Sequence, residues 1–508
     1  MNRSIMLNSV INAAAGLLLL VSGFCCSVIV ARLLGPEANG TVAFALWLTT
    51  TGSLVAELGT GVLLLRLLPQ LKAKGVDERA RRGFAAYLAF PVLVTTVLLL
   101  VLYGVFCRFG NGIQWIGATT TVAALIGVLL FVQSLGSFAK NYLIGEQRLG
   151  TFFYFTATAS VLQIGVVLAG VLLYGVEGAL VGYLAGQSIL FVYTVRILLT
   201  RRNKAGNRTR TLAGTSVVLF FEFMITAVFL TRSELVFLQH FRTVEEVGFY
   251  AVALSLANLA LQIPVQLTGS LIPFYAGLQG SDTGARTDAF AGVLRSFSYI
   301  TFPLCFGLAA IAVPLVVAIY GRAFEPAGMI VAVLAVGAPA YVFIQLATQY
   351  LYSMGRMKYR LGISGVAALL MVAGCLLVVP RWGGVGAAVV RDLVFLAMSI
   401  LLLGRLRTEN RSNGLVTVVF KVAVAAAACG FAALIVTRTM TGIGGLATAV
   451  ACGALVYGVM LRLLNAVEPQ DAAVMDRLLS RMPSQLARLP RLVFGLIVPG
   501  PAAPEAAK

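Results

Sequence analysis

Runs of about 20 mostly apolar residues follow one another along almost the whole chain, and only short polar segments separate them. A helix needs roughly 20 such residues to cross the hydrocarbon core of a bilayer. The chain contains about fourteen runs of this length, which predicts an all-α, polytopic membrane protein. The predicted spans are residues 8–31, 41–65, 84–106, 114–138, 151–174, 178–200, 213–238, 247–274, 293–319, 327–352, 361–380, 384–404, 415–437 and 442–464.

The overall composition supports the same class. Of the 508 residues, 59% are hydrophobic and 11% are charged, and the mean hydropathy is +0.94. A soluble globular domain is about a quarter charged. No water-soluble fold can bury this much apolar surface, so a soluble enzyme is excluded.

The positive charges indicate how the spans are oriented. If the N-terminus is cytoplasmic, 29 of the 38 Lys and Arg residues fall in inner segments, six fall in outer loops and three lie within spans. The positive-inside rule therefore predicts a cell inner-membrane protein with both termini in the cytoplasm. The net charge of +19 is then a topology signal, so we expect membrane lipids as partners and no nucleic acid. We also expect a short amphipathic helix from Asp471 to Arg481, lying on the inner membrane surface.

The two halves of the predicted bundle repeat each other at a spacing close to 208 residues. Similar short sequences follow or precede equivalent spans, in the same order, in both halves. The matching pairs are Gly40 with Gly248 and Gly178 with Gly386 at an offset of 208, Leu68-Pro69 with Ile272-Pro273 at 204, and the segments that begin at Gly145 and Gly355 at 210.

This repeat predicts how the chain is divided. Six spans in each half keep the two halves in the same orientation, related by an axis along the membrane normal. We expect an N-terminal six-helix lobe at 1–210, a C-terminal six-helix lobe at 211–411, two additional helices at 412–465 and a cytoplasmic amphipathic tail at 466–508. Rocking of two such lobes around a central cleft would give alternating access.

Residues for catalysis or metal binding are scarce. His240 is the one histidine and lies beside an outer loop, so a Ser-His-Asp triad or a histidine-rich metal site lacks its central residue. The seven cysteines form no C-x-x-C pair, which favours a packing role. No Walker glycine-lysine motif is present. We therefore expect no enzyme, no catalytic residues, no metal and no bound cofactor.

Ionisable residues inside the predicted spans are the candidate functional residues, because a charge in the bilayer is costly and usually faces a partner or a wet cavity. Two interpretations remain open: interhelical ion pairs, or groups that line a substrate cavity. For Glu57 and Glu222, the deepest, we favour the cavity, where a carboxylate can bind H⁺ or Na⁺ and couple transport to an ion gradient. The candidates are Glu57, Glu222, Arg232, Glu234, Arg391 and Asp392, together with Arg66 directly after the second span.

The repeat and the uncharged polar residues refine this set. At the offset of 208, Arg391-Asp392 corresponds to Tyr183-Leu184, so the shared architecture does not require these charges. Asn8 and Asn12 lie four residues apart on one face of the first span. Gln345 and Gln349 do the same in the tenth. Such faces either line the cleft or hydrogen-bond between helices.

Four segments together resemble the signatures of the polysaccharide transporter and O-antigen flippase family, within the multidrug/oligosaccharidyl-lipid/polysaccharide exporter superfamily. They are ARLLGPE at 31–37 followed by Gly40, EVGFY at 246–250, IYG at 319–321 with Phe324, and GGVGAA at 383–388. The resemblance covers roughly residues 5–460. It implies a V-shaped, two-lobe fold like that of multidrug exporters.

The resemblance also implies a function. Members flip a polyprenyl-diphosphate-linked oligosaccharide from the inner to the outer leaflet during cell-surface polysaccharide or lipopolysaccharide synthesis, alongside other polysaccharide-assembly proteins. Arginines suit the diphosphate through bidentate contacts, and Arg66, Arg232 and Arg391 are the candidates here. The alternatives are a cation-coupled multidrug exporter or a lipid II flippase of the same superfamily and, from another class, a membrane glycan polymerase or ligase.

Overall fold

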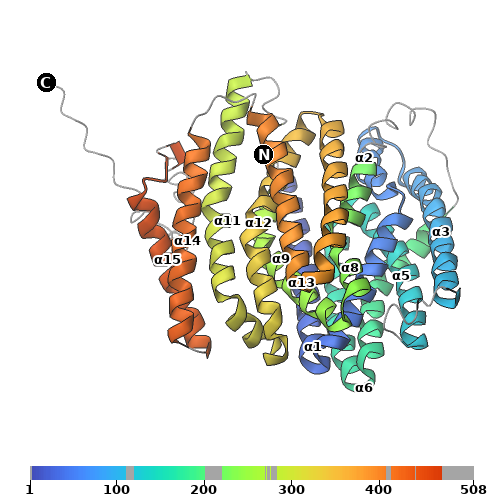
Figure 1. Cartoon of the computed structure of the whole chain (residues 1–508). Coiled ribbons are helices and arrows are strands. Elements are labelled where there is room, and N and C mark those ends of the chain that lie inside the picture. Colours follow the sequence, from blue (N-terminus) through green and yellow to red (C-terminus); the bar gives the residue numbers. More distant parts are fainter. Residues whose placement is uncertain are drawn as a thin grey trace. The chain divides into compact units, whose positions relative to one another are not determined.

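The computed structural model describes residues 3–109, 112, 119–200, 220–268, 271, 275, 283–407, 414–440, 442–468, 470 and 471. All regular elements in these ranges are helices (Figure 1). Ten of the described helices are long and apolar enough to cross a membrane. The all-α, polytopic fold class predicted from the apolar runs is therefore confirmed.

The chain forms two compact units. Unit 1 comprises Met1–Ser255 and Met357–Val390, and unit 2 comprises Leu256–Arg356 and Arg391–Lys508. The lobes expected at 1–210 and 211–411, and the additional helices and tail at 412–465 and 466–508, remain predictions. The principal helices are α1 (Arg3–Ala56), α2 (Thr60–Ala73), α3 (Glu78–Phe109), α5 (Thr120–Gly145), α6 (Leu149–Leu198), α8 (Glu234–Phe241), α9 (Val244–Thr268), α11 (Thr283–Tyr320), α12 (Glu325–Ser353), α13 (Met357–Arg407), α14 (Leu415–Thr439) and α15 (Gly442–Leu463).

Three helices are long enough for two spans each and contain a kink where the sequence predicts an outer loop. The non-helical residues are Gly35 (φ 82°), Gly175 (φ 59°) and Gly383 (φ 54°) in α1, α6 and α13. Glycine adopts positive φ without the Cβ penalty of other residues. The expected loops are thus tight kinks, and the described helices do not confirm the total of fourteen spans.

Two predicted spans are not continuous helices. The second breaks between α1 and α2, where Leu58 (φ 47°) and Gly59 (φ 73°) have positive φ. The seventh is helical over residues 220–225 and continues as a π-helix at Thr226–Leu230. It breaks before α8, at Arg232 (φ 62°). Both breaks lie beside candidate site residues.

The repeat is visible in the backbone. The kinks at Gly175 and Gly383 are 208 residues apart and have similar φ and ψ. The turn after α5 and the turn after α12 close with matching hydrogen bonds, from the Arg148 N–H to the Leu143 carbonyl and from the Arg356 N–H to the Leu351 carbonyl, both 2.9 Å.

These hydrogen bonds correct one sequence alignment. Arg148 pairs with Arg356 at 208, so the offset of 210 proposed for the segments at Gly145 and Gly355 is wrong by two residues. Gln147, at φ 60°, is the true counterpart of Gly355, at φ 71°. The sequence alignment matched glycine to glycine, whereas the position requires positive φ rather than a glycine. The counterpart proposed for Leu68-Pro69 lies outside the described residues.

Segments predicted to share a membrane side meet within unit 1. At the predicted inner side, the Lys72 ammonium donates to the Glu146 carbonyl at 3.0 Å and Arg81 pairs with the Glu146 carboxylate. At the predicted outer side, the Thr119 hydroxyl donates to Glu177 at 3.2 Å. The up-and-down order of these spans is therefore confirmed, whereas the cytoplasmic assignment of one side remains a prediction.

In unit 2, α14 and α15 lie side by side and α14 packs on α11 (Figure 1). The Tyr457 hydroxyl of α15 donates to the Tyr299 carbonyl of α11 at 2.8 Å. Beyond α15, Asp471 accepts hydrogen bonds from Arg295. Apart from Asp471 itself, the amphipathic helix predicted for Asp471–Arg481 lies outside the described residues.

Candidate functional site

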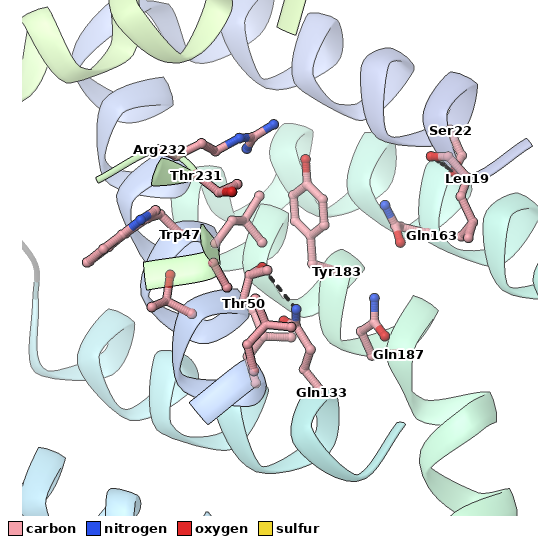
Figure 2. A pocket seen from close by; sticks show the side chains of 15 residues that line it. Leu19, Ser22, Trp47, Thr50, Gln133, Gln163, Tyr183, Gln187, Thr231 and Arg232 are labelled. Atoms are coloured by element: carbon pink, nitrogen blue, oxygen red, sulfur yellow. Dashed lines mark hydrogen bonds between the residues drawn. The ribbon is translucent and has the colours of Figure 1, made fainter. Parts of the chain in front are cut away.

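A cavity of about 350 Å³ lies within unit 1 (Figure 2). Its walls come from both halves of α1, from α5, from both halves of α6 and from the segment around Arg232. We call it the glutamine pocket, because three glutamines are among its lining residues. The other lining residues are partly polar and partly apolar. Its polar residues are Ser22, Trp47, Thr50, Thr51, Gln133, Gln163, Tyr183, Gln187, Thr231 and Arg232.

Hydrogen bonds and a close helix contact hold the glutamines. The Gln133 amide nitrogen donates to the Thr50 hydroxyl at 3.0 Å, and that of Gln163 lies 3.5 Å from the Cys26 sulfur. A Cβ on Gly186 would lie 2.5 Å from the Gln163 Oε1. Glycine at 186 therefore lets the two halves of α6 approach closely enough for Gln163 and Gln187 to line one cavity.

One buried polar atom of the pocket lining has no hydrogen-bond partner among the described residues. The indole Nε1 of Trp47 is buried and donates no hydrogen bond there. A buried donor left without an acceptor loses hydration without compensation. A bound ligand or water that offers an oxygen would remove this cost.

Arg232 supplies the positive charge of the pocket lining. Its backbone adopts positive φ at the break between the π-helix and α8, and its side chain is exposed. In the view of Figure 2, Arg232 lies at one end, Gln133 and Gln187 lie at the other, and the Tyr183 ring stands between them. The break in the predicted seventh span thus places the candidate Arg232 at the cavity instead of within a continuous helix.

Glu57 forms a second candidate centre, at the break between α1 and α2. It is 5% exposed, and its Oε2 accepts a hydrogen bond from the Asn141 amide at 3.0 Å. Its Oε1 is buried with no hydrogen-bond partner in the described part of the chain. A Cβ on Gly61 would lie 2.3 Å from the Asn141 Nδ2, so glycine at 61 makes room for this pair.

At the helix break beside Glu57, backbone carbonyls accept hydrogen bonds from neighbouring hydroxyl groups. The Thr60 hydroxyl donates to the Glu57 carbonyl at 2.7 Å, and the Thr95 hydroxyl of α3 donates to the Ala56 carbonyl at 2.6 Å. Lys140 of α5 interacts electrostatically with the Glu57 carboxylate. The carbonyls of Ala56 and Glu57 are therefore occupied, and the acceptor without a hydrogen-bond partner among the described residues is the Glu57 Oε1.

Glu222 has the alternative role, a buried ion pair. Its Oε1 lies 3.4 Å from the Arg360 guanidinium, and both side chains are less than a tenth exposed. The Thr226 hydroxyl donates to the same oxygen at 3.1 Å, and the Ser364 hydroxyl lies at 3.4 Å. Glu222 therefore forms an interhelical ion pair, and the expectation that it also lines a substrate cavity remains a prediction.

The remaining candidates are dispersed. Glu234 is fully buried in the first turn of α8. In unit 2, the Arg391 guanidinium lies 4.7 Å from the centroid of the Phe395 ring, which stacks on Tyr341, and Asp392 packs against Gly337. The side chains of Asn8, Asn12 and Arg66 lie outside the described residues. Within the described residues, no group of three or more His, Cys, Asp or Glu could hold a metal ion.

The sequence reasoning missed Gln133, Asn141, Gln163, Gln187 and Arg360. A usable signal existed for two of them, because Gln133, Ser137 and Asn141 follow one another at intervals of four on one face of α5. The pair noted in the tenth span, Gln345 and Gln349, is equivalent to Ser137 and Asn141 at the offset of 208. Transferring that pair through the repeat would have identified Asn141.

Comparisons with known proteins agree with this fold. A family model described as "Polysaccharide biosynthesis protein" matches residues 29–329. No curated protein matches the chain in sequence.

Three solved structures are similar. The lipid II flippase MurJ, in an inward closed conformation, has 13% identity and a TM-score of 0.68, and the match covers 89% of this chain and 98% of that chain. A multidrug resistance MATE family transporter of the MOP superfamily, inward-facing, has 13% identity and a TM-score of 0.62, with 80% and 99% covered. The Vibrio cholerae MATE transporter VcmN has 14% identity and a TM-score of 0.55, with 81% and 98% covered.

Proposed function

Because the chain belongs to the polysaccharide biosynthesis protein family, we propose that it is a flippase for a polyprenyl-diphosphate-linked oligosaccharide. It moves the glycan across the cytoplasmic membrane by alternating access, for the synthesis of a cell-surface polysaccharide. Its solved neighbours are a flippase and transporters, in keeping with a protein that relocates its substrate without chemical change. The partners of this function are membrane lipids, the lipid-linked glycan and other polysaccharide-assembly proteins.

The glutamine pocket is the observation that supports this proposal best. A glycan and a diphosphate cannot enter hydrocarbon without losing their hydration. A cavity within the membrane-spanning helices that offers amides, hydroxyls and one guanidinium replaces those lost hydrogen bonds. The prenyl tail needs no such site, because it stays in lipid.

The composition of the pocket also bears on the alternative of a cation-coupled drug exporter. A cavity for cationic drugs would favour carboxylates, whereas the one charged residue in the described lining is Arg232. The carboxylates of the predicted spans that would suit a cationic drug, Glu57, Glu222 and Glu234, are not among the lining residues. The pocket therefore favours a glycan over a cationic drug.

Deletion of the gene tests the proposal. In a strain without redundant flippases, we expect lipid-linked repeat units to accumulate on the inner leaflet and the surface glycan to disappear. An intact surface glycan in that strain would overturn the proposal. The purified protein should leave the covalent structure of added lipid-linked sugars unchanged, and their polymerisation or transfer would instead identify a polymerase or ligase.

We further propose that Glu57 couples transport to a gradient of H⁺ or Na⁺. The support is its buried Oε1, which has no hydrogen-bond partner among the described residues and lies beside a broken helix, since ion sites of transporters are often built at discontinuous helices. In proteoliposomes, the wild type should respond to an imposed H⁺ or Na⁺ gradient, and Glu57→Gln should lose this response. The exposed Glu37 provides the control, because Glu37→Gln should retain it. A Glu57→Gln protein that still responds to the gradient would refute the coupling role.

A further inference from the structure

Two arginines meet at the predicted inner side of unit 1, near the start of α3 and the end of α6. The Arg82 guanidinium donates to the Arg196 carbonyl, in the last turn of α6, at 3.2 Å. Arg82 is half-buried and Arg196 is exposed. The bond to the carbonyl uses one of the five N–H donors of Arg82. The contact therefore brings two cations together at the surface and leaves donors for a ligand.

The charge around this contact is not balanced. The acidic side chains of this end already have partners: Asp77 with the Arg79 N–H, Glu78 with Arg148, and Glu146 with Arg81. Within the described residues, neither Arg82 nor Arg196 forms a salt bridge. The sequence that follows α6, residues 199–210, adds five Lys and Arg residues and no Asp or Glu. This surface thus keeps a positive charge that a negatively charged ligand would neutralise.

The repeat shows that helix packing does not require the two arginines. At the offset of 208, Arg82 corresponds to Phe290 and Arg196 to Gly404. The Phe290 side chain is buried, and its ring centroid lies 5.0 Å from that of Tyr350. The scaffold therefore accepts an aromatic ring at the position of Arg82. The positive-inside rule does not require this pair either, because residues 199–210 already supply cations to the same inner segment.

Exposed apolar side chains adjoin the arginines. Only 17% of the most apolar stretch of α3 is buried, so most of this helix faces lipid. Tyr87 and Phe90 follow Arg82 by about one and two turns, and each is 42% exposed. On α6, Val192 lies one turn before Arg196 and is 50% exposed. Aromatic rings of this kind mark the headgroup level of a membrane, and the apolar side chains beyond it can contact an acyl chain.

We infer that Arg82 and Arg196 form a docking site for an anionic phospholipid of the inner leaflet. Its phosphate accepts charge-assisted hydrogen bonds from the two guanidiniums, and an acyl chain runs along Tyr87 and Phe90. The unbalanced positive charge favours a headgroup with a net negative charge over a zwitterionic one, because the ammonium of phosphatidylethanolamine would be repelled. The bound lipid joins the start of α3 to the end of α6. The site is separate from the glutamine pocket, since neither arginine is among the lining residues described there.

Photo-cross-linking in nanodiscs tests the site with the full-length protein. The discs consist of phosphatidylethanolamine with a small fraction of photoactivatable phosphatidylglycerol, and the adducts are mapped by mass spectrometry. We expect adducts in the α3 peptide that contains Tyr87 and Phe90, and far fewer with photoactivatable phosphatidylethanolamine. Arg82→Gln with Arg196→Gln should lower the affinity for phosphatidylglycerol about thirtyfold, since each cation near the surface contributes about a factor of five.

Two further variants separate lipid binding from general charge and from folding. The control is Lys358→Gln with Arg462→Gln, which removes two exposed cations from other predicted inner positions and should leave the α3 adducts unchanged. Arg82→Phe introduces the residue of the second half. It should melt at the wild-type temperature in phosphatidylethanolamine, and it should lose the rise in melting temperature that phosphatidylglycerol gives the wild type.

Several results would overturn the docking site. Equal adducts from the two photoactivatable lipids would exclude selection by charge, and an equal loss in the Lys358 and Arg462 control would reduce the effect to general attraction. Displacement of phosphatidylglycerol from α3 by an equal concentration of polyprenyl diphosphate would assign the two arginines to a different lipid. A melting temperature that falls equally in both lipids in the double arginine variant would make the contact purely structural. None of these results bears on the proposed flippase function, which the gene deletion tests separately.

Discussion

Gly40 and Gly248 pack against each other within unit 1 at backbone contact, and each approaches the residue four positions before the other. A Cβ on Gly40 would lie 1.9 Å from the Val244 carbonyl oxygen, and a Cβ on Gly248 would lie 2.1 Å from the Pro36 carbonyl oxygen. The two glycines are 208 residues apart in the sequence, and so are Pro36 and Val244, whose carbonyls they approach. The contact is therefore reciprocal between equivalent segments of the repeat, as in a two-fold interface.

This contact predicts that neither glycine tolerates a side chain. Gly40→Ala or Gly248→Ala should separate the two segments and disturb the hydrogen bond from the Asn39 amide to the Gly248 carbonyl, 3.1 Å. We expect each variant to lower the free energy of unfolding by about 1–3 kcal/mol, as overpacking typically does. Thermal unfolding of the purified protein in nanodiscs measures this loss.

Gly23→Ala is the matched control. Gly23 lies in α1, and nothing lies within 4 Å of the position that its Cβ would occupy. Alanine has the higher helix propensity, so this variant should unfold at the same temperature or slightly higher. Equal melting temperatures for Gly40→Ala and Gly23→Ala would show that the contact does not hold the segments together.

The sequence identified both glycines as repeat equivalents, yet it could not show that they touch. Alignment of two halves establishes which positions correspond, and the approach of two backbones depends on how the helices pack. The same distinction explains the error at Gly355, where matching residue types suggested an offset of 210 and the backbone conformation of Gln147 restores 208. Helix positions followed from apolar run length, which is a local property, and were largely correct.

The candidate site was harder to predict for a related reason. Glu57 and Glu222 were both selected as candidates because they lie deep in predicted spans. Their roles, however, depend on contacts with residues that are distant in the sequence. Arg360 pairs with Glu222 at 3.4 Å, whereas Glu57 interacts electrostatically with Lys140 and keeps an Oε1 that has no hydrogen-bond partner among the described residues. Likewise, Gln163 and Gln187 share a cavity because α6 kinks at Gly175, so their proximity could not be inferred from helical periodicity.

Glu222 and Arg360 should behave as a structural pair. Removing one member of a buried ion pair leaves an uncompensated charge and typically costs about 3–5 kcal/mol. Glu222→Gln and Arg360→Met should each lower the unfolding free energy by this order. The double variant should recover most of the loss, because neither charge then remains buried. A double-mutant cycle from denaturation measurements gives the coupling energy.

A different outcome would reassign Glu222. If Glu222→Gln reduces flipping in proteoliposomes while its melting temperature equals that of the wild type, the residue acts in transport rather than in stability. Additive losses in the double variant would equally contradict the pairing. The gradient response measured for Glu57→Gln should remain present in Glu222→Gln, which separates the two carboxylates in one assay.

Arg81 and Glu146 form a bidentate pair at the predicted inner side of unit 1. The Arg81 Nε and one terminal nitrogen donate to the two Glu146 carboxylate oxygens, both at 2.9 Å, and the side chains are 10% and 2% exposed. Arg81→Gln would leave the Glu146 carboxylate buried without its cation. We expect a loss of about 3–5 kcal/mol, measured by thermal unfolding.

Arg79 provides the comparison, because it lies two residues away on the same helix and is exposed. Arg79→Gln removes the same charge from the surface and should change the unfolding free energy by no more than about 0.5 kcal/mol. Similar losses in the two variants would mean that net charge, rather than the buried pair, governs stability here. Because the Arg81 pair is buried, its contribution should also persist at high salt.

Arg295 fixes the end of the described chain to α11 in unit 2. Its guanidinium donates to the Asp471 carboxylate at 2.9 and 3.2 Å and lies 3.3 Å from Glu468, and its side chain is 9% exposed. Arg295→Gln should release this segment and loosen α15, which also contacts α11 through Tyr457. We expect faster hydrogen exchange in α15, with unchanged exchange in peptides of unit 1.

The exposed Arg438 at the end of α14 is the control. Unchanged exchange of α15 in Arg295→Gln, or an equal increase in Arg438→Gln, would show that the ion pair does not anchor this segment.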